Sequence, residues 1–149
     1  MSIQVFTEEP PSFFSESTKG SCFLEIERGK RRKILLMHRL RHKGAGDQWC
    51  TPARKVSKGE SIRPALEHKV ADILGSKEGS VRIERVRTVY VVSTSLGCFE
   101  HKLYRLRLRR QVIQNPDYQA YEWVTPRQAL SKNLVDELAE CIKIFYKLS

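Results

Sequence analysis

The sequence lacks the features that would place the protein in a membrane or outside the cell. No apolar run approaches the roughly 18–20 residues that a membrane span needs. The first residues, MSIQVFTEEPPSFF, lack the basic, then apolar, then small-residue order of a secretory signal. We therefore expect a cytoplasmic protein with no membrane partner.

Cysteine is scarce and is not grouped. The chain contains four cysteines and no C-x-x-C or paired Cys/His signature. Zinc sites need such spacing, so we do not expect one. We expect buried free thiols at Cys22, Cys50, Cys98 and Cys141.

The length fits one folded unit. A chain of 149 residues can bury a core of its own, and no repeat or low-complexity tract divides it. Residues 1–19 are polar and contain two prolines, which predicts an N-terminal arm with a short edge segment. Residues 20–149 are predicted to form a single domain.

Positive charge is in excess. Lys and Arg number 27 against 17 Asp and Glu, which gives a formal net charge of +10. Such a surface attracts polyanions, so nucleotides, RNA and acidic partners are all candidate ligands. The alternative is a basic surface that binds none of them. The excess is concentrated at residues 28–33, 39–43 and 105–110.

The order of predicted elements indicates an α+β fold with a mixed β-sheet between helices. Gly29 allows a turn between the first two strands, and Ser61 and Gly75 are suited to cap a helix over 61–74. A last helix is predicted over 133–148 from its apolar periodicity. The predicted strands are 22–27, 33–39, 81–92, 99–109 and 121–124, and Thr125 is predicted to cap a short helix over 126–130.

Residues 49–75, WCTPARKVSKGESIRPALEHKVADILG, resemble the Nudix box, G-x5-E-x7-R-E-U-x-E-E-x-G-U with a W-x-x-P lead-in. Five positions match the pattern: Trp49, Pro52, Glu60, Val70 and Gly75. A second stretch is similar to a run in many Nudix proteins, with Asn115-Pro116-Asp117 followed by Glu122-Trp123-Val124-Thr125-Pro126 and Ala129-Leu130. The resemblance covers about residues 20–148 and implies the Nudix fold, with Trp49, Pro52 and Gly75 in structural roles.

The resemblance also implies a chemistry, for which most of the expected ligands are missing. Nudix hydrolases cleave a nucleoside diphosphate linked to another group, with Mg²⁺ or Mn²⁺ held by box glutamates on one helix face. Here those positions carry Lys69, Asp72 and Ile73. Arg54 replaces the first glycine and His68 the box arginine. We interpret Ile73 as part of the apolar stripe of the helix.

Two sets of candidate site residues follow. If a metal binds, Glu60 and Asp72 are the catalytic candidates and His68 is a third candidate metal ligand. Glu100 and His101 would join if the fold brings them near, although a surface His–Asp pair and a solvated Glu-His are the alternative. If no metal binds, side chains hold the phosphate themselves, and the candidates are Arg54, Lys55, His68 and Lys69.

Three functions remain open. The site residues favour a Nudix-fold protein with lost or much weakened metal-dependent hydrolysis that still binds a nucleotide or another phosphorylated ligand. The first alternative is an active hydrolase of (d)NTPs or related nucleotides with an altered metal site. A further alternative is a basic RNA- or protein-binding module that uses strand 102–110, with Tyr104 for base stacking.

Overall fold

A single mixed sheet with helices on both faces organises the chain. The computed structural model describes residues 2–39, 47–77, 79–109 and 118–149. In chain order the elements are β1 (Ile3–Phe6), β2 (Ser17–Arg28), β3 (Arg31–Arg39), β4 (Trp49–Cys50), β5 (Ala53–Ser57), α1 (Ile62–Leu74), β6 (Glu84–Ser93), β7 (Gly97–Arg107), β8 (Tyr118–Val124), α2 (Pro126–Ala129) and α3 (Leu138–Tyr146).

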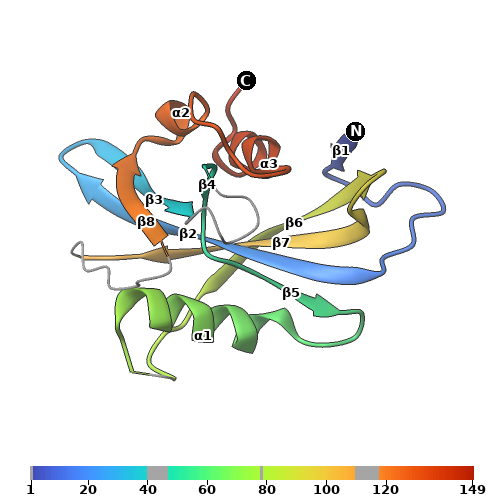
Figure 1. Cartoon of the computed structure of the whole chain (residues 1–149), viewed down its shortest axis with the longest axis horizontal. Coiled ribbons are helices and arrows are strands. Elements are labelled where there is room, and N and C mark those ends of the chain that lie inside the picture. The colour runs from blue at the N-terminus through green and yellow to red at the C-terminus, as the bar shows by residue number, and fades with distance from the viewer. Residues whose placement is uncertain (1, 40–46, 78, 110–117) are drawn as a thin grey trace.

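The layers match the predicted fold class. Helix α1 covers one face of the sheet, and α2 and α3 lie on the other (Figure 1). The sheet is mixed because β2 pairs in parallel with β7, whereas the other strand pairs are antiparallel. The predicted α+β fold with a mixed sheet between helices is confirmed. None of the described helices is long and apolar enough to cross a membrane.

The side chains of the central strand β2 alternate between two hydrophobic cores. Cys22 and Leu24 belong to the core under α1, whereas Phe23 belongs to the core under α3. Each side chain is fully buried, as expected for a strand covered on both faces. The face of a β2 residue therefore decides which helix layer it meets.

Strand β2 shares one edge between two partners. It pairs with β5 over residues 17–21 and with β3 over residues 25–28. Between these two pairings, the Cys22 amide donates to the carbonyl of Pro52. The chain between β4 and β5 therefore crosses the edge of β2 where the sheet divides.

The predicted helix of the box is confirmed. Helix α1 starts at Ile62 with Ser61 as its N-cap residue, and Gly75 ends it in the left-handed conformation at φ 66°. The Ser61 side chain makes no capping hydrogen bond. Ile73 is fully buried with the rest of the apolar stripe, which confirms its assignment to the core. The positive φ of 64° at Gly29 likewise confirms the turn between β2 and β3.

Several boundaries differ from the sequence prediction. The last helix begins at Leu138 rather than at 133, because the backbone at Asn133 and Val135 hydrogen-bonds to Trp49 in β4. Strand β6 begins at Glu84 rather than 81, and the Ile83 amide is held by the Glu67 carboxylate of α1. Strands β4 and β5 were not predicted, because both are short and β5 carries two exposed cations.

The structure describes only part of the second stretch that resembles Nudix proteins. Thr125 and Gln128 form the reciprocal capping box of α2, which confirms the predicted cap. Asn115, Pro116 and Asp117 lie outside the described residues, as do residues 40–43 and 110 of the basic clusters.

A glycine in β2 lets α1 pack close to the sheet. A Cβ atom added at Gly20 would lie 2.6 Å from Cγ1 of Ile62 and 3.2 Å from Cδ2 of Leu66. We expect Gly20→Ala to lower the free energy of unfolding by about 1–3 kcal/mol, because overpacking displaces core side chains. Urea denaturation measures the change.

A double-mutant cycle with Ile62→Ala provides the control. If the clash with Ile62 causes the loss, the double variant is more stable than the sum of the single changes predicts. Additive effects would show that Gly20 is not the point of close packing.

Candidate functional site

A cavity of about 210 Å³ opens where β2 passes from β5 to β3. Its walls come from parts of the chain that are far apart in sequence: β2, the β4–β5 region, α1, β7 and the segment that leads into α3. The lining residues are Lys19, Ser21, Cys50, Thr51, Ala53, Arg54, Lys55, Lys69, His101, Val135, Asp136, Glu137 and Leu138.

Three buried polar side chains form a hydrogen-bonded line in the wall of this cavity. Oγ of Ser21 lies 2.7 Å from Nε2 of His101. Nδ1 of His101 lies 3.0 Å from Oε1 of Glu137. The three residues come from β2, β7 and the N-cap of α3. We call them the Ser21–His101–Glu137 line.

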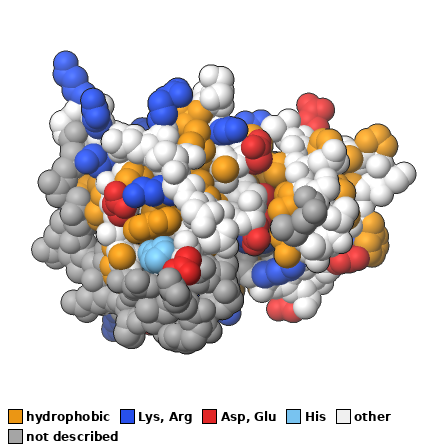
Figure 2. Space-filling model, turned by 45° about the horizontal axis from the view of Figure 1, so that its top comes forward, with side chains coloured by type: hydrophobic (Ala, Val, Ile, Leu, Met, Phe, Trp, Pro, Cys, Tyr) orange, Lys and Arg blue, Asp and Glu red, His pale blue; other side chains and the backbone are white. Residues whose placement is uncertain are grey.

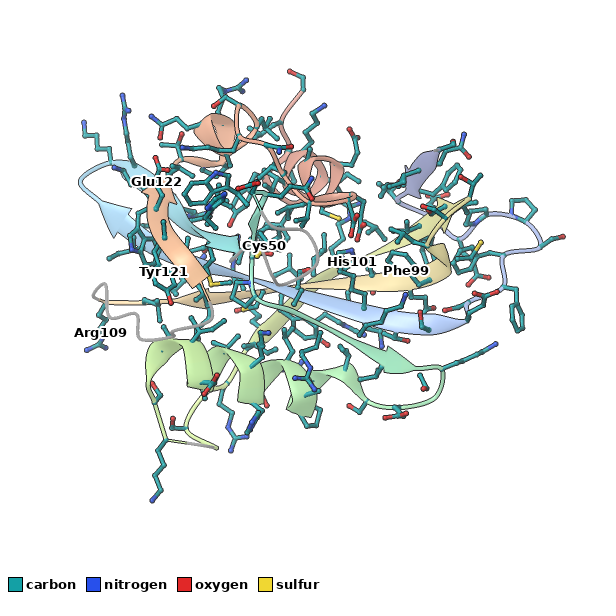
Figure 3. The ribbon with its side chains drawn as sticks, viewed as in Figure 1. Cys50, Phe99, His101, Arg109, Tyr121 and Glu122 are labelled. Atoms are coloured by element: carbon teal, nitrogen blue, oxygen red, sulfur yellow. The ribbon has the colours of Figure 1, made fainter. Side chains whose placement is uncertain are left out.

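Two neighbouring strands fix Ser21 and His101. Ser21 lies in the middle of the sheet, between Ala53 of β5 and Leu103 of β7. His101 lies on β7 two residues after the buried Phe99, so both side chains point to the α3 face (Figure 3). The exposed fractions are 2% for Ser21 and 1% for His101. Neither can change rotamer freely, since both are enclosed by packed neighbours.

A lysine completes the charge balance at Glu137. Nζ of Lys19 lies 3.0 Å from the same Oε1 of Glu137 that His101 contacts. The other carboxylate oxygen, Oε2, is buried and has no hydrogen-bond partner among the described residues.

The surroundings set the protonation of the line. Burial acts to raise the pKa of Glu137, but the hydrogen bond from His101 and the charge of Lys19 outweigh it and lower that pKa to about 2. Burial is also the main cause that lowers the pKa of His101, against the opposing hydrogen bond with Glu137. At neutral pH the carboxylate is charged and the imidazole is neutral.

Positive charge dominates the cavity lining. Four Lys or Arg side chains and two carboxylates line it. Lys19 pairs with Glu137. The rest of the lining carries three cations, Arg54, Lys55 and Lys69, and one carboxylate, Asp136. Nζ of Lys55 also lies over the ring of Phe99, 5.1 Å from its centroid. The cavity suits an anionic ligand.

The structure divides the predicted site residues into two groups. It places Arg54, Lys55 and Lys69 together in the cavity. His68 faces a different groove, with Pro64 and Arg82. Glu60 lines a shallow groove at the end of β5. Asp72 is exposed on α1 and lines none of these three hollows.

The separation of the candidate ligands argues against a divalent-metal site. Among residues 2–39, 47–77, 79–109 and 118–149, no three His, Cys, Asp or Glu side chains are grouped so that they could hold an ion. Glu60, His68 and Asp72 form no such group among these residues, and the cavity carries Lys69 where an oxygen ligand would be needed. The described residues do not fit a Mg²⁺ or Mn²⁺ centre built on the box.

The alternative interpretation of Glu100 and His101 as a solvated pair was wrong for His101. His101 is buried and bonded on both ring nitrogens, whereas Glu100 lies on the opposite face of β7 and lines the groove with Glu60. The alternation of a strand puts neighbouring residues on opposite faces, so the two side chains cannot act together.

The predicted basic strand is largely engaged within the protein. Arg105 and Arg107 approach the buried carboxylate of Glu25 at 3.2 Å and 3.7 Å. The guanidinium of Arg105 also lies over the ring of Phe145. Tyr104 is 3% exposed, so it is not available for the base stacking that the nucleic-acid alternative required. Lys and Arg side chains still project at the end that carries the β2–β3 turn, and exposed hydrophobic side chains lie at the opposite end (Figure 2).

Sequence reasoning missed Lys19, Ser21 and Glu137. Ser21 and His101 are 80 residues apart, so no local motif joins them. One signal for Glu137 was available in the sequence: it precedes an apolar helix and has no cation three or four residues away that would explain it.

The prediction for the cysteines is confirmed at three of four positions. Cys22, Cys50 and Cys141 are buried free thiols, whereas Cys98 is half-buried.

Comparison with known proteins identifies the fold. No family model matches the chain, and no curated protein sequence does. Solved structures do match. The NUDIX domain of Shewanella oneidensis NrtR, complexed with ADP ribose, is 19% identical with a TM-score of 0.67, over 95% of this chain and 94% of that one.

Two further solved structures are similar to this chain over most of their length. RenU, a Nudix hydrolase from M. smegmatis, is 16% identical with a TM-score of 0.68, over 97% of this chain and 92% of that one. The E. coli dihydroneopterin triphosphate pyrophosphohydrolase is 15% identical with a TM-score of 0.65, over 95% and 97%. This chain therefore has the Nudix fold, as the resemblance of residues 49–75 implied.

The Ser21–His101–Glu137 line makes the stability of the protein depend on pH. The unfolded chain protonates His101 near the ordinary histidine pKa of 6.5, whereas the folded chain keeps the imidazole neutral to lower pH. Its contribution is therefore fully present above pH 6.5 and is lost as the pH falls below that value. We expect the unfolding free energy to decline as the pH falls below about 6.5, with a slope from this group of at most about 1.4 kcal/mol per pH unit.

Urea denaturation across this pH range tests the assignment. His101→Gln removes the titrating group and should flatten the decline. His68→Gln makes the same substitution at an exposed position outside the line and serves as the control. Equal slopes for His101→Gln and the wild type would contradict the assignment.

Proposed function

We propose that this protein binds a nucleotide or a related phosphorylated ligand in the central cavity through its own cations, and that metal-dependent hydrolysis is lost or much weakened. Arg54, Lys55 and Lys69 hold the phosphate groups. Each position falls within the stretch that resembles the Nudix box.

One observation carries this proposal: Lys69 lies in the cavity where the Nudix pattern has a glutamate. An ammonium group repels a divalent cation and attracts a phosphate oxygen, so the same position that would hold metal now favours the ligand directly. The guanidinium of Arg54 adds paired donors that suit phosphate geometry.

The neighbours with the same fold support a phosphorylated ligand. One was solved with ADP ribose, and another is named as a dihydroneopterin triphosphate pyrophosphohydrolase. Function depends on the site rather than on the fold, so the cationic lining of this cavity remains the stronger argument. The cavity of about 210 Å³ has room for a phosphate-bearing part of such a ligand.

Titration calorimetry with ADP ribose, ADP and inorganic pyrophosphate tests binding. We expect at least one of them to bind with the same Kd, within about twofold, in EDTA and in Mg²⁺. Lys69→Glu should weaken that binding at least about tenfold, which corresponds to about 1.4 kcal/mol, because it replaces an attraction with a repulsion.

Lys77→Glu is the matched control. It makes the same charge change at an exposed position beyond the end of α1 and outside the cavity lining, so it should leave Kd unchanged. Binding that appears only with a divalent metal, or is absent for all three probes, would contradict the proposal.

A phosphate-release assay tests the loss of hydrolysis. Nucleoside triphosphates, dinucleoside polyphosphates and nucleotide sugars should yield no release above background with Mg²⁺ or Mn²⁺. Robust turnover would instead support an active hydrolase. A Lys69→Glu, Asp72→Glu variant tests whether restored carboxylates restore turnover. Ile73 is left unchanged, since a glutamate at this fully buried position would place an unpaired charge in the core.

A further inference from the structure

The Ser21–His101–Glu137 line has the geometry of a nucleophile, a base and an orienting carboxylate. The hydroxyl oxygen lies 2.7 Å from one ring nitrogen, and the carboxylate lies 3.0 Å from the other. Such constellations recur on unrelated folds and are recognised by geometry rather than by sequence order. The Nudix box contributes none of these three residues.

The hydrogen bonds assign the direction of each proton. The Glu137 carboxylate can only accept, so Nδ1 of His101 must donate to it. Because the imidazole is neutral, Nε2 then carries a lone pair and accepts from the hydroxyl of Ser21. This is the tautomer that a general base needs in order to take a proton from serine.

Position within the molecule favours Ser21 as the reacting group. Ser21 and His101 both line the cavity, whose other walls carry Arg54, Lys55 and Lys69. The thiol of Cys141 lies 3.6 Å from Nδ1 of His101, on the side already occupied by Glu137. Burial raises the pKa of that thiol, so it stays protonated and unreactive.

We propose that Ser21 is a nucleophile, with His101 as its general base and Glu137 as a positioning residue, and that it takes up an acyl group from a small ester or anhydride whose leaving group carries phosphate. The choice of a phosphate-bearing leaving group rests on the proposed phosphate site. The assignment of Ser21 as the nucleophile does not depend on that site.

The reaction balances without a metal or a redox partner. Oγ of Ser21 bonds to the carbonyl carbon while its proton passes to Nε2 of His101. The tetrahedral intermediate then breaks the bond from carbon to the phosphate-bearing oxygen, and the proton returns from His101 to that leaving group. Water hydrolyses the acyl-serine by the same route, which restores Ser21. The cations of the cavity wall face the negative charge that develops.

Covalent labelling tests the nucleophile. The wild-type protein, treated with diisopropyl fluorophosphate, should gain a single diisopropylphosphoryl group as fluoride leaves, and peptide mapping should place it on Ser21. Ser21→Ala should remain unlabelled. Ser61→Ala should label like the wild type, because Ser61 is exposed and its side chain makes no capping bond.

A second measurement separates catalysis from structure. His101→Gln keeps Ser21 and a side chain that can hydrogen-bond, but it removes the base, so labelling should slow at least about 100-fold. Circular dichroism checks that each variant is folded. Labelling of Ser21 at an equal rate in wild type and His101→Gln would overturn the proposal, and so would wild-type protein that gains no label on Ser21.

Acetyl phosphate tests the class of substrate. The wild type should release phosphate from it faster than Ser21→Ala does, by at least about tenfold. Labelled Ser21 with no such difference would overturn the phosphate-bearing substrate and leave the nucleophile in place. Because labelling needs no nucleotide, a failure to bind ADP ribose overturns the proposed binding function without touching this test.

Discussion

The divided edge of β2 is the constraint on which the site depends. A strand in a continuous sheet has one neighbour on each side, and its side chains are covered by packed helices. Here β2 pairs first with β5 and then with β3, and Lys19 and Ser21 lie in the wall of the cavity between these two partners. His101 reaches the same point because β7 runs parallel beside β2. Glu137 reaches it from the N-cap of α3, where it contacts Lys19 and His101.

Two buried carboxylates tie the α3 layer to the sheet. Glu137 is held by Lys19 and His101, and Glu25 meets Arg105 and the hydroxyl of Tyr146. A buried charge without a partner costs several kcal/mol, so each carboxylate requires its cations to be in place. Part of the positive charge that seemed to suit an external polyanion is therefore used inside the protein.

The sequence was sufficient for the fold but not for the site. Helix α1 could be predicted because its apolar spacing, its boundary residues and Gly75 all lie within one short stretch. The buried line could not, since it joins residues that only the sheet brings together. Strand β5 escaped prediction for a related reason: its pairing with β2, rather than its own composition, makes it a strand.

The candidate residues of the box show the same limit. A helical pattern predicted Ile73 to be buried, and it is. The pattern could not tell that Lys69 would line the cavity while Asp72 and Glu60 would not, because that depends on how α1 lies against β5. Spacing along a helix defines a face, but the neighbouring elements decide what that face meets.

The close packing at Gly20 has a mechanical consequence. Gly20 lies between Lys19 and Ser21, and the atoms of α1 lie directly against its backbone. Only the side chains of Ile62 and Leu66 lie between the backbone at Gly20 and the helix that carries Lys69. Tightly packed interiors transmit displacement with little loss. If phosphate binds at Lys69 as proposed, we expect the helix and the strand to shift as one unit, so that the anion-binding side and the hydroxyl side of the cavity change position together.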